Sequence, residues 1–154
     1  MSARFPIDQP ARIFPAIDLR GGRCVRLIQG QRNEEIHYDD DPVAVARRWR
    51  DEGATCLHVI DLGAAFGEDS SSTVVLEICR EIDLPVQTGG GIRDEAKVEE
   101  LLSGGVARVI LGTRAFKDPD FLARMIDTHG PERVIVGLDC DGDRVKVAGW
   151  EEAS

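Results

Sequence analysis

Short apolar runs alternate with amphipathic segments along this chain of 154 residues. Apolar runs without polar alternation, such as "RVIVGL", predict strands that are buried on both faces, as in a parallel sheet. Five such strands are expected, at residues 12–18, 55–63, 84–91, 107–113 and 133–139.

Amphipathic segments with capping signals lie between these strands. The segment 41–53 has Asp41 as a candidate N-cap, Pro42 in the first turn and Gly53 as a stop signal. Three further helices are expected at residues 71–82 (capped by Ser70 or Ser71), 93–105 and 118–130. The alternation of strand and helix fits βαβ units and a parallel sheet.

Two parallel architectures compete for this pattern. A doubly wound sheet carries its glycine-rich turn after the first strand, whereas "TGGG" here follows the third. A (β/α)₈ barrel gathers its chemistry at the carboxyl ends of many strands. Asp18, Asp61 and Asp139 each end a predicted strand, so the barrel is favoured.

One sequence frame occurs twice. "PAIDLRGGRCVRLIQG" and "GLDCDGDRVKVAGW" share D-x-x-G-x-R, which begins at Asp18 in the first copy and at Asp139 in the second. Strands one and five lie opposite each other in an eight-stranded barrel, so the repeat predicts two homologous halves. A whole barrel needs about 250 residues. We therefore expect an α/β half-barrel over residues 12–154, with four βα units and strand five, preceded by an irregular extension at 1–11.

Composition narrows the possible partners. A net charge of −9 and a pI near 4.8 disfavour nucleic acid, although backbone N–H groups can still bind a phosphate. No apolar run approaches the ~18 residues of a membrane span, and the start lacks a signal-peptide pattern. We expect no membrane partner and a cytoplasmic location.

The cysteines indicate a reducing environment. Cys24, Cys56, Cys79 and Cys140 show no C-x-x-C spacing, so packed, reduced thiols are expected rather than a metal site. No cofactor is expected.

Four segments resemble a known family. "IFPAIDLRGGRCVRLIQG", "LHVIDLGAAFGE", "VQTGGGIRDEAKVEELLSGGVARVILGTRAF" and "VIVGLDCDGDRVKVAGW" are similar to the N-terminal part of the phosphoribosylformimino-5-aminoimidazole carboxamide ribotide isomerases of histidine biosynthesis. The cyclase subunit of imidazole glycerol phosphate synthase is a related barrel. "AIDL", Arg26 and the pair Gly149-Trp150 favour the isomerases.

This resemblance implies an Amadori rearrangement of a bis-phosphorylated ribotide, from an aminoaldose (ProFAR) to an aminoketose (PRFAR). A general acid opens the ribose ring and a general base removes the C2′ proton, which two carboxyl groups with separated pKa values can do. By resemblance Asp18 matches the base and Asp139 the acid. Taken singly, each aspartate could instead cap a helix or bond a loop.

Glycines at two strand ends suggest a phosphate pocket. Without Cβ atoms, the turns in "TGGGIR" and "LGT" let backbone N–H groups approach a phosphate, although a tight turn alone would also need glycine. The expected lining is Gly90, Gly91, Gly112 and Thr113, with Arg93 nearby unless it pairs with Asp94 or Glu95. The resemblance adds Arg26 as a substrate contact and Trp150 as a stacking residue; the alternatives are a surface arginine and a frayed end.

A half-barrel has consequences for activity and assembly. The family's second phosphate site comes from strands seven and eight, so we do not expect full activity from this segment alone. Strands one and five would be open edges and the interior would be exposed, which predicts a homodimer or higher oligomer. Three hypotheses follow: the isomerase, the cyclase, and a non-enzymatic half-barrel that binds phosphate and self-assembles.

Overall fold

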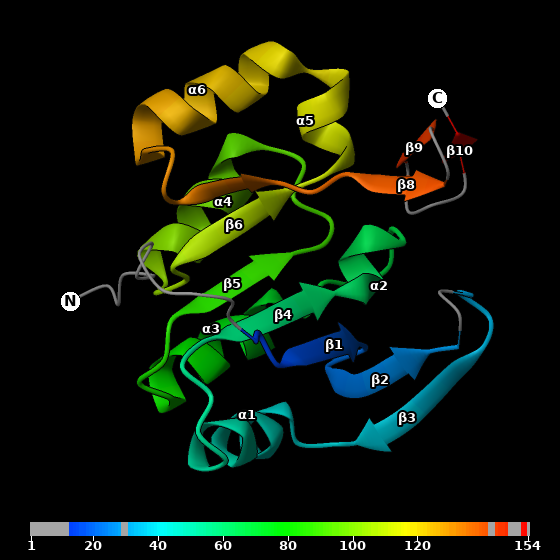
Figure 1. Ribbon diagram of the computed structural model, residues 1–154, viewed down its shortest axis with the longest axis vertical. Coiled ribbons are helices and arrows are strands. Elements are labelled where there is room, and N and C mark those ends of the chain that lie inside the picture. Colours follow the sequence, from blue (N-terminus) through cyan, green and yellow to red (C-terminus); the bar gives the residue numbers. More distant parts are fainter. Residues whose placement is uncertain (1–12, 29–30, 142–143, 148–151, 154) are drawn as a thin grey trace.

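The computed structural model describes residues 13–28, 31–141, 144–147 and 152–153. Its main sheet has seven strands in the order β3-β2-β1-β4-β5-β6-β7 and is not closed (Figure 1). The parallel strands are β1 (Ala16–Arg20), β4 (Leu57–Asp61), β5 (Val86–Gly89), β6 (Arg108–Leu111) and β7 (Val134–Val136). The expected α/β class, a partial barrel sheet of parallel strands, is confirmed.

The four predicted helices are present, and the first two begin directly after their predicted caps, Asp41 and Ser71. They are α1 (Pro42–Asp51), α3 (Ser72–Glu81), α4 (Glu95–Ser103) and α6 (Pro119–His129). The carboxylates of Asp41, Asp94 and Asp118 accept hydrogen bonds from N–H groups in the first turns of α1, α4 and α6, at 2.8 to 3.0 Å. Two short helices were not expected: α2 (Leu62–Ala65) after β4 and α5 (Thr113–Lys117) after β6.

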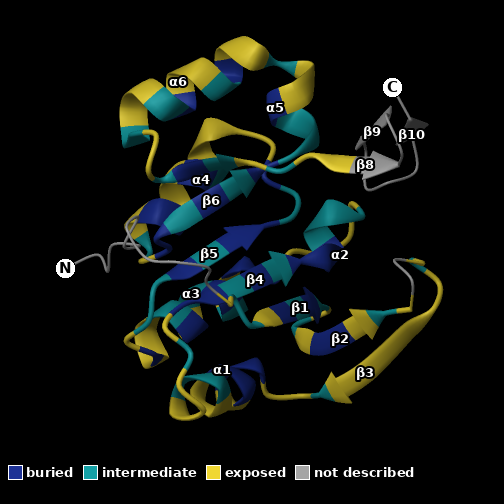
Figure 2. Ribbon diagram, viewed as in Figure 1, coloured by how far each residue is buried: buried dark blue, intermediate teal, exposed yellow. Residues whose placement is uncertain are grey.

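Helices cover one face of the sheet. In Figure 1, α3 and α4 lie behind the strands and α1 lies below β1. Ile17, Val59 and Leu111 are fully buried on the side of the sheet that the helices cover. The alternate residues of the strands point to the opposite face and are only partly buried (Figure 2). We call this second surface the inner face; it is formed by Asp18, Arg20, His58, Ile60, Gln87, Arg108, Ile110 and Ile135.

A polar row crosses the inner face near the start of the strands. Arg108 Nη2 donates to Gln87 Oε1 at 2.7 Å, and Gln87 Nε2 lies 2.8 Å from His58 Nδ1. Burial lowers the pKa of His58, which fits a neutral ring whose Nδ1 accepts the amide proton.

The segment between the first strand and the first helix, for which no strand was predicted, is not a loop. It forms β2 (Arg23–Leu27) and β3 (Glu35–Asp39), which extend the sheet in antiparallel pairs beside β1. The expectation that strand one is an open edge is therefore wrong: the sheet ends at β3 on one side and β7 on the other.

The predicted strand 133–139 is shorter than expected. β7 ends at Val136, and the chain continues into a separate antiparallel sheet of β8 (Asp139–Asp141), β9 (Arg144–Val147) and β10 (Glu152–Ala153). The predicted extension at 1–11 lies outside the described residues. Among the helices of the described segments, none has the length and apolar character needed to cross a membrane.

Candidate active site

Asp18 lies on the inner face, in the middle of β1. Its neighbours Ile17 and Leu19 are fully buried on the helix side, so the alternation of the strand turns the Asp18 carboxyl the other way. The side chain is half-buried between paired residues Val25 of β2 and Ile60 of β4. Burial raises the pKa of Asp18, and the positive charge of Arg26 partly opposes this. A carboxyl group with raised proton affinity is better suited to accept a proton near neutral pH.

Arg26 is brought to Asp18 by the antiparallel hairpin that the sequence did not reveal. It lies on β2, next to Val25, which pairs with Asp18. Its side chain is exposed. Its positive charge lies close enough to Asp18 to act on the pKa of the carboxyl.

Asp139 lies beyond the main sheet. After β7, the Gly137 N–H donates to the Leu111 carbonyl at 3.0 Å, and Asp139 then begins β8 as an exposed residue. In Figure 1 the arrowheads of β4, β5 and β6 point toward the side on which β8 lies. Asp139 therefore follows the carboxyl end of the sheet, and its opposition to Asp18 stays a prediction.

Asp61 has a structural role. It pairs in register with Leu19 on the helix side and is only 4% exposed. Its carboxylate accepts hydrogen bonds from Ala64 N at 3.0 Å, Ser70 Oγ at 2.8 Å and Ser71 N at 2.7 Å. These bonds cap α2 and shape the loop that leads into α3.

Gly90 and Gly91 form the turn after β5 and pack directly on this loop. Their φ angles are +102° and +64°, which favour glycine. A Cβ atom on Gly90 would lie 2.7 Å from the Asp61 carbonyl carbon, and one on Gly91 would lie 2.6 Å from the Ala64 carbonyl carbon. Packing alone therefore requires both glycines, so their presence does not by itself indicate a phosphate.

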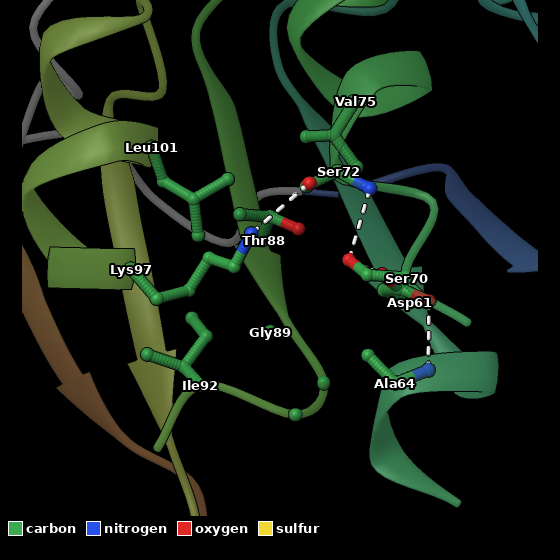
Figure 3. A pocket seen from close by; sticks show the side chains of 12 residues that line it. Asp61, Ala64, Ser70, Ser72, Val75, Thr88, Gly89, Ile92, Lys97 and Leu101 are labelled. Carbon is green, nitrogen blue, oxygen red and sulfur yellow. Dashed lines mark hydrogen bonds between the residues drawn. The ribbon is translucent and has the colours of Figure 1, made fainter. Parts of the chain in front are cut away.

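A cavity of about 50 Å³ lies beside this turn, on the helix side of the sheet. Asp61, Ser72, Thr88, Gly90 and Lys97 are among its lining residues (Figure 3). The side chain of Lys97 lies along the cavity wall, and its Nζ donates to Ser72 Oγ at 3.1 Å and to Glu100 Oε2 at 2.8 Å. A polar cavity of this size can hold ordered water.

Gly112 differs from Gly90 and Gly91. Its φ is −97°, and a Cβ atom there would meet only the Gly137 carbonyl oxygen, at 3.8 Å. Thr113 follows and begins α5. Gly89 pairs with Ile110 across β5 and β6, so the "GGG" and "LGT" turns leave neighbouring strand ends. The described structure gives no packing reason for glycine at 112.

Arg93 does not pair with its neighbours. Asp94 caps Lys97 N, and Glu95 accepts from Arg124 Nε at 2.9 Å. Arg93 instead reaches across to the Ala64 carbonyl oxygen at 3.4 Å, over the loop after β4. The structure thus gathers Gly90, Gly91 and Arg93 at one turn; Trp150 lies outside the described residues.

No metal centre is apparent in the described part of the chain, where no three His, Cys, Asp or Glu side chains are grouped to hold an ion. Cys24, Cys56 and Cys79 are free thiols. Burial raises the pKa of the Cys24 and Cys79 thiols to about 11, so both are protonated at neutral pH.

Sequence reasoning missed a cluster of charged side chains at the end of β1. Arg20 and Arg32 bind Glu68, which is 48 residues from Arg20 in the sequence. No local pattern marks such a contact.

Fold and site together define an incomplete α/β barrel with a half-buried carboxyl on its inner face and glycine turns at its strand ends. The chain belongs to the family described as Histidine biosynthesis protein, which matches residues 12–154.

Three curated relatives are each named 1-(5-phosphoribosyl)-5-((5-phosphoribosylamino)methylideneamino) imidazole-4-carboxamide isomerase. The protein of Desulforudis audaxviator is 52% identical over 92% of this chain and 54% of its own length. Those of Nitratidesulfovibrio vulgaris and Deinococcus radiodurans are 49% and 45% identical, over 90% and 93% of this chain and 57% and 60% of their own lengths. The chain spans little more than half the length of these relatives.

Proposed function

We propose that this chain is the N-terminal part of a histidine-biosynthesis isomerase that acts in the cytoplasm and converts the aminoaldose ribotide ProFAR to the aminoketose PRFAR. The names of the relatives support this assignment. The observation that carries it is Asp18, a half-buried carboxyl with a raised pKa beside Arg26 on the inner face.

The chemistry needs one acid and one base. Asp139 donates a proton to the ribose ring oxygen as the bond from C1′ to that oxygen breaks, which leaves a protonated Schiff base. Asp18 then removes the C2′ proton, and the resulting enol tautomerises to the ketone. The raised proton affinity of Asp18 supports the role of base, and Arg26 and Trp150 contact the substrate.

One phosphate of the ribotide binds at the ends of β5 and β6. Gly90, Gly91, Gly112 and Thr113 line this site and Arg93 borders it. Gly112 gives the strongest support, because its Cβ position is open apart from one contact at 3.8 Å. Gly112→Ala should weaken the binding of inorganic phosphate about tenfold by calorimetry. The control is Gly53→Ala, at the far end of α1; equal phosphate affinity in both variants would refute this site.

Complementation tests the isomerase. In a histidine auxotroph that lacks ProFAR isomerase, the chain is co-expressed with the C-terminal half of the D. audaxviator relative, which is 52% identical over the matched part. Growth is expected with the parent chain and not with Asp18→Asn. Equal growth with Asp18→Asn would instead favour the half-barrel that binds phosphate without catalysis.

Self-association is the expected behaviour of the isolated chain. The inner face is only partly buried, β3 and β7 are open edges, and Ile36 and Val136 on them are 52% and 42% exposed. A homodimer would cover these surfaces. Size-exclusion chromatography with light scattering tests this, and a stable monomer at micromolar concentration would refute it.

A further inference from the structure

Four charged residues form a cluster where β1 ends: Arg20, Arg32, Glu35 and Glu68. Arg20 Nε and Nη2 donate to the two carboxylate oxygens of Glu68 at 2.9 and 2.7 Å. Arg20 Nη1 donates to Glu35 Oε2 at 2.7 Å and to the Arg32 carbonyl oxygen at 3.1 Å. Such two-pronged contacts fix the direction of a guanidinium group as well as its distance.

Arg32 completes the cluster from the opposite side. Its Nη2 donates to Glu68 Oε1 at 3.0 Å and to the Phe66 carbonyl oxygen at 3.3 Å. The Phe66 ring lies 4.8 Å from the Arg32 guanidinium carbon and 5.5 Å from that of Arg20. A separate bond, from Gly22 N to Ser71 Oγ at 3.2 Å, ties the turn between β1 and β2 to the loop after α2.

The cluster links three segments that are distant in sequence. Arg20 ends β1, Arg32 and Glu35 lie at the turn and start of β3, and Glu68 follows α2. The turn it holds comes directly after Arg26 and Leu27 of β2. β2 is also paired with β1 through three residue pairs and with β3 through four.

Two charges of the cluster, on Arg20 and Glu68, persist through the neutral range. Hydrogen bonds from Arg20 and Arg32 lower the pKa of Glu68 to about 2, and bonds to Glu68 and Glu35 raise the pKa of Arg20. The ion pair of Arg20 and Glu68 therefore keeps both charges near neutral pH. The members of the cluster are partly exposed, so added salt screens it.

We propose that Arg20 and Glu68 are positioning residues: they clamp the β2–β3 turn to the loop after β4 and thereby hold Arg26 beside Asp18 for substrate binding. The role in substrate binding rests on the proposed function; the clamp itself does not. Arg20 shares the inner face with Asp18, two residues away on β1, so the strand that carries the candidate base also carries the clamp.

The test compares Glu68→Gln with Glu95→Gln. Both remove one exposed carboxylate that accepts from an arginine, but Glu95 joins α4 to α6, away from the hairpin. Hydrogen exchange is followed by mass spectrometry in peptides that cover 28–38. Exchange there should rise about five- to tenfold in Glu68→Gln and stay unchanged in Glu95→Gln. In 1 M NaCl the parent should approach Glu68→Gln, which should change less because only the Arg20–Glu35 ion pair is left in it to be screened.

Ribotide binding gives the functional readout. Calorimetry with ProFAR on the same three proteins should show several-fold weaker binding for Glu68→Gln only. Exchange in 28–38 within twofold of the parent would overturn the clamp. Faster exchange with unchanged ProFAR affinity would overturn its positioning role. If the parent does not bind ProFAR, the positioning role in substrate binding is overturned for the isolated chain, while complementation decides the proposed function and the exchange data decide whether the clamp exists.

Discussion

Replacing Gly90 by alanine should destabilise the turn after β5 in two ways, through its positive φ angle and through the contact of a Cβ atom with the Asp61 backbone. Gly90 has φ +102°, and Gly53, just after α1, has φ +96°. Both backbones are unfavourable for an L-residue, at about 1–2 kcal/mol each, of which ~0.5 kcal/mol or more is offset because alanine also restricts the unfolded chain. The two sites differ in space: nothing lies within 4 Å of a Cβ on Gly53, whereas one on Gly90 overlaps the Asp61 backbone.

The overlap of a Cβ atom on Gly90 with the Asp61 backbone determines how much more unfolding free energy Gly90→Ala should lose than Gly53→Ala. Asp61 N, C and O are main-chain atoms that the hydrogen bonds of the Asp61 carboxylate hold in place, so relief requires the turn to move. Forced overpacking of this kind costs roughly 1–3 kcal/mol. We therefore expect Gly53→Ala to lose about 1 kcal/mol of unfolding free energy and Gly90→Ala about 3 kcal/mol.

Urea unfolding followed by circular dichroism measures both losses of unfolding free energy. The two variants should show the same dependence of this free energy on urea concentration, which indicates that the same transition is compared. Equal losses in the two variants, within about 0.5 kcal/mol, would show that the close approach of Gly90 to Asp61 does not exist in solution.

Three further substitutions test the hydrogen bonds of Asp61 to the loop after β4 and the pKa shifts of Asp18 and His58. Asp61→Asn should cost about 2–3 kcal/mol in urea unfolding, because an amide NH₂ would face donors that now bond a carboxylate oxygen. Burial raises the pKa of Asp18 above 3.8, so the folded state binds the proton of this carboxyl more tightly than the unfolded state does. The free energy of unfolding therefore falls as the pH rises above 3.8. Asp18→Asn should remove that fall and be more stable than the parent at pH 7. Burial lowers the pKa of His58 below 6.5, so stability is lost as pH falls below 6.5, and His58→Gln should flatten thermal midpoints measured between pH 7 and 5.

Local signals explain which elements the sequence predicted. The helix α1 was predicted from its candidate cap Asp41, and the other helices from similar local signals and the spacing of apolar residues. In the structure Asp94 and Asp118 also act as caps, of α4 and α6. β3 was missed although its sequence, "EIHYD", alternates polar and apolar residues, which is a strand signal. The alternation does not reflect burial, since Ile36 and Tyr38 are both exposed. The strand exists because its backbone pairs with β2.

The candidate site likewise contains residues that the sequence could predict and residues that it could not. The repeated frame singled out Asp18, and the structure places it on the inner face with a raised pKa. The same reasoning put Asp61 among the strand-ending acids at the barrel mouth, but Asp61 faces the helices and bonds its own loop. A one-residue change of register reverses the face of a strand residue, so a strand-ending aspartate cannot be assigned to either side from sequence alone. The contact between Arg20 and Glu68 could not be predicted, since it depends on two loops that meet only in the folded chain.

The glycines therefore carry unequal weight for phosphate binding. Gly90 and Gly91 would be required even in a protein that binds nothing, because Cβ atoms there would collide with Asp61 and Ala64. Gly112 has no such constraint, since the nearest atom to its Cβ position is 3.8 Å away. A glycine that packing does not demand, at the end of a strand next to the glycine turn, is the residue whose small size a ligand would explain. The phosphate hypothesis thus depends on Gly112 more than on the glycine-rich motif that first suggested it.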